Sequence, residues 1–122
     1  MFSHHHDEAR KHVLNECQTT YATCMRTVYH CTSDLTIPAD DALVMALMSA
    51  ANACYDCRSF SDHDSHPLRD AMTNCAQRCA NVATICSDSD DYFLQQAVEH
   101  CRHCDQQINE YLHSVESYHV AV

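Results

Sequence analysis

The sequence predicts an all-α protein, an antiparallel four-helix bundle with up-down-up-down connectivity, and three observations lead to this prediction. Glycine is absent from the 122 residues, which disfavours hairpin turns and phosphate-binding loops because both depend on glycine backbone conformations. Long stretches are rich in residues of high helix propensity. Within them, apolar residues and cysteines recur at steps of three and four, the period of one helix face.

Breaks in this pattern predict helices at residues 4–33, 40–60, 67–87 and 90–117. Pro38 interrupts the first connection, and Pro67 suits the first turn of the third helix. The serine and aspartate run at 87–91 offers N-cap residues for the fourth helix. Short connections make consecutive helices antiparallel. We expect one domain over residues 1–122, with roughly the first eight residues flexible.

Each expected helix carries one seam of core positions, as in antiparallel bundles. The first seam consists of Leu14, Cys17, Tyr21, Cys24, Val28, Cys31 and Leu35. The second consists of Leu43, Leu47, Ala50, Cys54 and Cys57. The third consists of Leu68, Met72, Cys75, Cys79, Val82 and Cys86. The fourth consists of Leu94, Ala97, Cys101, Cys104, Ile108, Tyr111 and Val115. All ten cysteines therefore lie on predicted core positions.

The composition supports a core built partly from sulfur. Leu, Ile, Val and Phe together make up 21 of 122 residues and the net charge is −10, values typical of disordered chains. On the seams, cysteine occupies positions where aliphatic residues would usually be found. The sequence thus predicts a folded bundle with a thiol-lined interior.

The depth of each thiol follows from counting residues along antiparallel helices. Cys31 and Cys86 fall near the end that holds the first and third connections, and Cys17 and Cys57 fall as a pair towards the opposite end. A central cluster is expected between them, formed by Cys24, Cys54, Cys75, Cys79, Cys101 and Cys104.

Thiols at this spacing favour metal binding over disulfides. Helix neighbours three or four apart have Cβ atoms about 5–6 Å apart, whereas a disulfide needs about 3.5–4.5 Å. Thiolates select Cu(I), Zn(II) or iron–sulfur clusters. Zinc takes four ligands per site and clusters usually take loop cysteines, so thiols strung along a bundle axis best suit several Cu(I) ions. The candidate ligands are Cys17, Cys24, Cys31, Cys54, Cys57, Cys75, Cys79, Cys86, Cys101, Cys104 and His100.

Over residues 9–117 the chain resembles the cytosolic copper storage proteins. The motifs that carry the resemblance are Cys54-Tyr-Asp-Cys57, Cys75-Ala-Gln-Arg-Cys79, Cys101-Arg-His-Cys104 and the heptad series Cys17, Cys24, Cys31. The resemblance implies a cysteine-rich four-helix bundle that stores many Cu(I) ions inside each protomer and assembles as a homotetramer. A protomer interface, or alternatively the rest of the protomer core, would use the apolar residues off the seams, Val44, Met48, Ala51, Tyr55, Ile85, Phe93 and Val98.

Other function classes fit less well. Only 7 Lys and Arg face 17 Asp and Glu, which argues against a nucleic-acid partner. No apolar run suggests a membrane segment or an export signal, so we expect a cytoplasmic protein. The Glu-x-x-His sequences at Glu110–His113 and Glu116–His119 lie off the seam, so no di-iron enzyme is expected. Two alternatives remain: a structural or redox-responsive bundle without metal, and a zinc-binding interaction module.

Additional histidines are secondary candidates for guiding metal. His63 and His66 lie in the second connection, and a histidine group near the N-terminus consists of His4, His5, His6 and His12. We favour the interpretation that these residues are simply polar surface positions.

Overall fold

The computed structural model describes the backbone of residues 2–33 and 41–121, and the side chains of residues 7–33 and 41–116. Within these ranges the chain forms four helices and no strand. The helices are α1 (Phe2–Ser33), α2 (Asp41–Ser59), α3 (His66–Cys86) and α4 (Tyr92–Ala121). The predicted fold class is confirmed. Pro38 and the predicted seam residue Leu35 lie within residues 34–40, which are outside the described residues.

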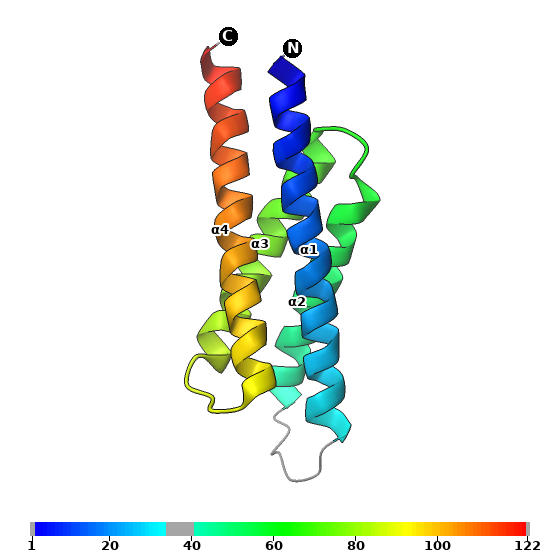
Figure 1. The fold of residues 1–122 in the computed structure, drawn as a ribbon, viewed down its shortest axis with the longest axis vertical. Helices are drawn as coiled ribbons and strands as arrows, with labels where there is room; N and C mark the ends of the chain where they lie inside the picture. Colours follow the sequence, from blue (N-terminus) through cyan, green and yellow to red (C-terminus); the bar gives the residue numbers. More distant parts are fainter. Residues whose placement is uncertain (1, 34–40, 122) are drawn as a thin grey trace.

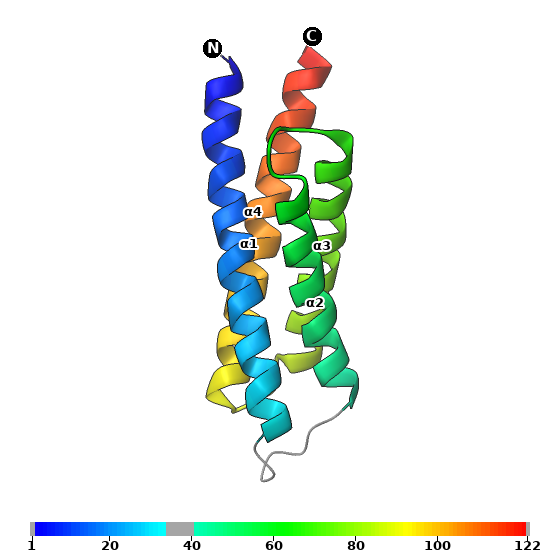
Figure 2. The same ribbon diagram turned by 90° about the vertical axis from the view of Figure 1, so that its right-hand side faces the viewer.

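The helices form a closed ring. Each packs against the next along the chain, and α4 packs against α1 (Figure 1). Both chain ends lie at the same end of the bundle as the α2–α3 connection, and α1 and α4 extend past that connection (Figure 2). This is the predicted antiparallel, up-down-up-down arrangement. None of the described helices has the length and apolar character needed to cross a membrane.

Side-chain caps define where α3 and α4 begin. Ser65 adopts an extended conformation, and its Oγ accepts a hydrogen bond of 3.2 Å from the backbone N–H of Leu68. Asp91 Oδ1 accepts one of 3.0 Å from the N–H of Leu94. Both caps satisfy donors that the first turn of a helix leaves free. At its other end α4 continues to Ala121 rather than ending at residue 117, because no glycine or proline interrupts it.

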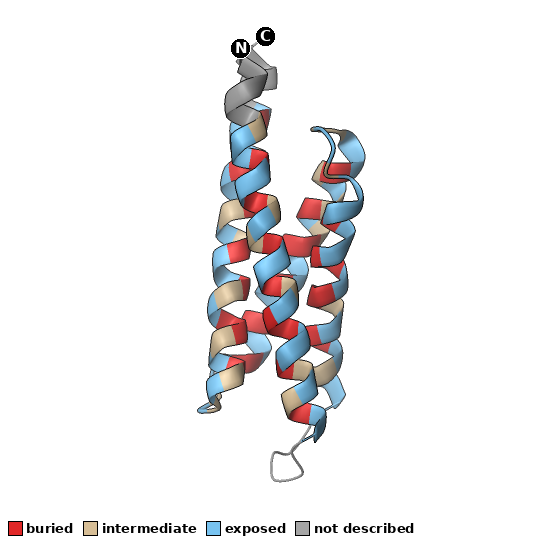
Figure 3. Ribbon diagram, turned by 45° about the vertical axis from the view of Figure 1, so that its right-hand side comes forward, coloured by how far each residue is buried: buried red, intermediate tan, exposed pale blue. Residues whose placement is uncertain are grey.

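The core runs along the bundle axis, where the inward faces of all four helices are buried (Figure 3). Every predicted seam residue of α3 and α4 is buried, and on the predicted seam of α2 all are buried except Leu43, which is partly buried. Large apolar side chains fill the half of the core towards the α2–α3 connection, among them Leu68, Met72, Ile108 and Val115. The ten cysteines share the remainder with buried alanines and with Leu47, Val82 and Leu94.

The predicted seam of α1 is wrong at three positions. Leu14, Tyr21 and Val28 are only partly buried. The residues buried in their place are Val13, Thr20, Thr23 and Thr27.

Threonine can occupy this interface because its hydroxyl reaches a backbone carbonyl. Thr20 Oγ1 donates to the carbonyl of His100 at 3.3 Å, and Thr27 Oγ1 lies 2.7 Å from the carbonyl of Thr23 on α1 and 3.2 Å from that of Phe93 on α4. A buried hydroxyl that is hydrogen-bonded avoids most of its desolvation cost. Small, satisfied side chains let α1 approach α4, while the larger Tyr21 lies at the rim against Tyr55, with ring centroids 5.9 Å apart.

Candidate metal centre

All ten cysteines are buried inside the bundle and none forms a disulfide. Each helix contributes at least two of them. Helix α1 carries Cys17, Cys24 and Cys31. Helix α2 carries Cys54 and Cys57. Helix α3 carries Cys75, Cys79 and Cys86. Helix α4 carries Cys101 and Cys104. The prediction that the thiols line the interior is confirmed in its geometry.

Two sets of thiols are compact enough to hold a metal ion. In each set, all sulfur atoms lie within 4.8 Å of one another. The larger set joins three helices and consists of Cys54, Cys75, Cys79 and Cys104. The smaller set joins three helices and consists of Cys17, Cys57 and Cys75. Because Cys75 belongs to both, the two sets form one continuous group of sulfur atoms.

Further thiols extend this group along the axis. The Sγ atoms of Cys17 and Cys104 lie 3.8 Å apart, which connects α1 to the larger set. Those of Cys24 and Cys101 lie 3.7 Å apart, between α1 and α4. Nearest the α3–α4 connection, Cys31 and Cys86 lie close enough for Cys31 to help raise the pKa of Cys86.

The grouping differs from the expectation in two respects. Cys17 and Cys57 do not form a separate pair, since both share a set with Cys75. Cys24 and Cys101, which were expected in the central cluster, belong to neither compact set and lie together as a pair. Cys54 and Cys57 fall into different sets, as their expected depths indicated, although they belong to one Cys-x-x-Cys motif. The relative rotation and stagger of neighbouring helices, which helical spacing does not specify, decide which sulfur atoms meet.

The thiols act strongly on one another's ionisation. Hydrogen bonding to Cys104 raises the pKa values of Cys54 and Cys75 above that of an ordinary cysteine thiol. The pKa of Cys104 is lowered, chiefly by hydrogen bonds from Cys17 and Cys54. Hydrogen bonds from Cys17 and Cys75 lower the pKa of Cys57 to about 5. A metal ion that binds this group must therefore displace protons from the thiols whose pKa is raised.

The two ends of the bundle are built differently. At the α2–α3 connection, the Arg10 guanidinium donates to Asp7 Oδ1 at 2.8 Å and to the carbonyl of Asp62 at 3.4 Å. Tyr111 Oη donates to Asp64 Oδ1 at 3.4 Å. These contacts tie the connection to α1 and α4.

At the opposite end, thiols lie close to the surface. Cys86 lines a surface pocket together with Ser87 and Ser89. Nearby, His30 Nε2 lies 2.9 Å from Asp91 Oδ2, and its ring stacks on Phe93 with centroids 4.1 Å apart. Burial, followed by the charge of Asp91, raises the pKa of Cys31. Of the ten buried thiols, those of Cys31 and Cys86 at the α3–α4 end therefore lie nearest to solvent.

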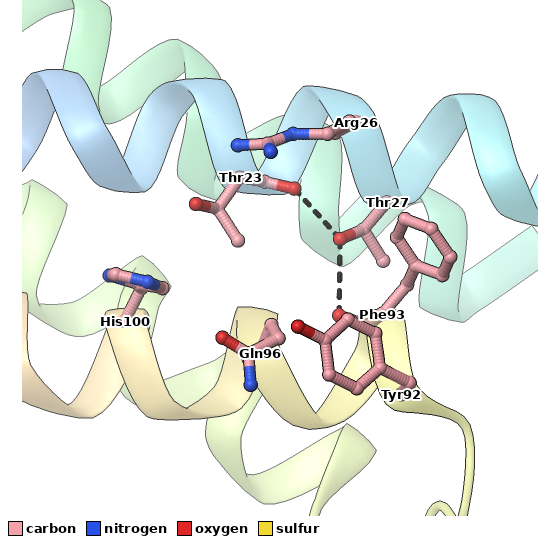
Figure 4. A pocket seen from close by; sticks show the side chains of 7 residues that line it. All are labelled: Thr23, Arg26, Thr27, Tyr92, Phe93, Gln96 and His100. Atoms are coloured by element: carbon pink, nitrogen blue, oxygen red, sulfur yellow. Dashed lines mark hydrogen bonds between the residues drawn. The ribbon is translucent and has the colours of Figure 1, made fainter.

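His100 belongs to neither compact set of thiols. It lines a separate pocket of about 120 Å³ between α1 and α4, together with Thr23, Arg26 and Gln96 (Figure 4). Its Nδ1 lies 3.7 Å from Glu16 Oε1. His63 is exposed in the α2–α3 connection, and His66 is exposed at the first residue of α3. The side chains of His4, His5 and His6 lie outside the described residues.

The chain matches the family model described as copper storage protein over residues 6–113. The chain belongs to the copper storage protein family. The matched range contains all ten cysteines and both compact thiol sets. Comparison with curated proteins found no match, and comparison with solved structures found none either.

Membership of the copper storage family agrees with what the thiol geometry can do. The family is named for storage rather than for catalysis, and thiol groups of this density can bind metal. Glu110, His113 and Glu116 are exposed on α4, so they do not face the interior as the ligands of a di-iron bundle would. The side chain of His119 lies outside the described residues.

Proposed function

We propose that the protein stores several Cu(I) ions per chain on the thiolates of its interior. The overlap of the two compact sulfur sets at Cys75 is the main support, because neighbouring Cu(I) ions can share bridging thiolates. The proposed ligands are all ten cysteines. His100 remains a candidate ligand from the sequence alone, and its position outside both sets gives that role no geometric support.

Charge balance favours Cu(I) over a divalent ion in this core. Each Cu(I) that replaces a thiol proton exchanges one positive charge for another, so a filled interior with equal numbers of ions and thiolates carries no added charge. Zn(II) held by four thiolates leaves a net charge of −2, which is costly to bury. Monovalent ions can therefore fill the bundle without creating buried charge.

A zinc-binding module is the second candidate, because one observation favours it. Four sulfur atoms within 4.8 Å of one another, those of Cys54, Cys75, Cys79 and Cys104, match the ligand number of a tetrahedral zinc site. Cys24 and Cys101 form only a pair, so a zinc site would leave them without a role. A two-coordinate Cu(I) ion accounts for such pairs as well.

We further propose a cytoplasmic location and a homo-oligomeric assembly. A reducing compartment keeps thiols ready for metal. Exposed apolar side chains on the bundle surface, including Met48 at 43%, Tyr55 at 54% and Ile85 at 42%, provide material for contacts between protomers. Ala51 and Val98 are buried and instead complete the protomer core.

Titration of the reduced protein with Cu(I) against a chromophoric Cu(I) chelator tests the proposed function. We expect several equivalents per chain to be withheld from the chelator. Uptake of one equivalent or less would overturn multi-ion storage. A parallel Zn(II) titration separates the two candidates, since tight binding of a single Zn(II) with no further Cu(I) capacity would favour the zinc module.

A further inference from the structure

Three metal-ligating side chains meet outside the thiol core, on the surface between α1 and α4. Glu16 comes from α1, and His100 and His103 come from α4. Glu16 Oε1 lies 3.0 Å from His103 Nδ1 and 3.7 Å from His100 Nδ1. The two histidines are three residues apart, so they lie on one face of α4. Two imidazoles and one carboxylate thus converge from two helices.

The carboxylate oxygen at the centre of this group is unusual. Glu16 Oε1 is buried and has no hydrogen-bond partner of good geometry among the described residues. The side chain of Glu16 is 16% exposed, whereas those of His100 and His103 are 32% and 49% exposed. A buried carboxylate oxygen is costly unless a donor or a cation satisfies it. His103 Nδ1 forms an ion pair with this oxygen when the ring is protonated, and hydrogen bonding to Glu16 raises the pKa of His103. A metal ion held by the same atoms would take the place of that proton.

We propose that Glu16, His100 and His103 form a surface site for a divalent transition-metal ion such as Zn(II), separate from the thiol core. Imidazole and carboxylate ligands suit divalent ions of this kind. Ligand atoms about 2.0–2.1 Å from a tetrahedral ion lie about 3.3 Å from one another. The observed separations of 3.0 and 3.7 Å lie on either side of that value. Water completes the coordination on the exposed side.

A small side-chain movement completes the site. Among the described residues only thiol sets have all ligand atoms within 4.8 Å, so the two imidazoles must approach each other when the ion binds. His100 has room to turn because it borders the pocket between α1 and α4 (Figure 4). The net charge of −10 also favours a cation at the surface.

The site differs from the thiol core in ligand chemistry, and this difference provides the test. The protein is first saturated with Cu(I), in a His4→Ala, His5→Ala, His6→Ala background that removes the N-terminal histidines. Zn(II) is then added, with stoichiometry measured by calorimetry and ligation by zinc X-ray absorption. We expect one equivalent of Zn(II) bound through nitrogen and oxygen at about 2.0–2.1 Å, without the sulfur distance of about 2.3 Å.

Matched variants identify the residues. Glu16→Gln and His103→Ala should each abolish this equivalent, whereas His113→Ala, an exposed histidine elsewhere on α4, should retain it. Unchanged zinc binding in Glu16→Gln and His103→Ala, or zinc bound through sulfur alone, would overturn the proposal.

The inference does not depend on copper storage. If the chain takes up no Cu(I), the same variants are compared in the metal-free protein, where all ten thiols are present in every sample. A difference of one equivalent between the parent and Glu16→Gln would still support the surface site, and no difference would refute it.

Discussion

The sulfur atoms of Cys54 and Cys75 lie 3.4 Å apart across the interface between α2 and α3. This separation is shorter than the 3.7 Å between Cys24 and Cys101. The two cysteines lie on different helices, so small rotations of their side chains bring the sulfur atoms together without bending a helix backbone. The relationship has consequences for oxidation and for metal capacity.

Mild oxidation of the metal-free protein should form the Cys54–Cys75 disulfide first. With diamide, the two thiols are oxidised to one disulfide while diamide is reduced to the hydrazine. Peptide mapping by mass spectrometry identifies the bridge, and Cu(I)-loaded protein should resist oxidation because its thiolates are occupied. A first bridge between Cys54 and Cys57 would contradict the structure, since helix neighbours at this spacing are poorly placed for disulfides.

Replacing Cys75, which belongs to both compact sets, should lower the Cu(I) capacity more than replacing Cys86, which belongs to neither. Cys75→Ser removes a ligand from both compact sets, whereas Cys86→Ser changes neither. We expect the Cu(I) capacity, measured by chelator competition, to fall further in Cys75→Ser than in Cys86→Ser. Equal losses would show that the compact sets are not the binding units. Circular dichroism of each metal-free variant checks that the helices persist.

Stability of the metal-free protein should fall at alkaline pH. Burial, followed by the charge of Cys31, raises the pKa of Cys86 from 9.0 to about 11. Between these values the unfolded chain binds fewer protons than the folded chain, so the free energy of unfolding decreases as pH rises. The contribution of Cys86 is up to about 3 kcal/mol. Urea unfolding at pH 8 to 11 should show a shallower decline in Cys86→Ala, and identical slopes would refute this role.

The affinity for Cu(I) should rise with pH, whereas the stability of the metal-free protein falls. Ions must displace thiol protons, so the apparent affinity for Cu(I) should rise with pH. Chelator competition at several pH values measures this trend directly. A pH-independent affinity would mean that protons are not displaced.

The N-cap of α4 should contribute measurably to stability. Asp91→Ala removes the acceptor for the Leu94 N–H and the partner of His30. We expect a loss of about 0.5–2 kcal/mol in the free energy of unfolding. The neighbouring Asp90 is exposed and provides the control, because Asp90→Ala should change stability little. Equal effects of the two substitutions would argue against the cap.

Copper should rescue a weakened core. Leu47 is fully buried on α2, and Leu47→Ala should lower the free energy of unfolding by about 2–5 kcal/mol. Ligands that bind only the folded state raise its stability, so Cu(I) loading should raise the melting temperature of both the parent and Leu47→Ala. An unchanged melting temperature after loading would place the copper outside the bundle.

Helix positions and the location of the thiols followed from local physics. Propensity, Pro67 and the Asp91 cap set helix boundaries, and the seam period placed all ten cysteines inside. The seam of α1 was mispredicted because Tyr21 is apolar enough to suggest a core position and Thr20 is not. Only the α4 carbonyl opposite Thr20 makes a buried hydroxyl acceptable there.

By itself, the sequence determined a four-helix bundle with a sulfur-rich interior, because the helical period fixes which side chains share a face of one helix. Only the tertiary structure decided which faces meet and at what height. That arrangement made Cys75 a member of two sets, left Cys24 and Cys101 as a pair outside both sets, and brought Glu16 to His103. The physical reason is that the rotation and stagger of each helix result from packing all four together, and no spacing within a single helix encodes them.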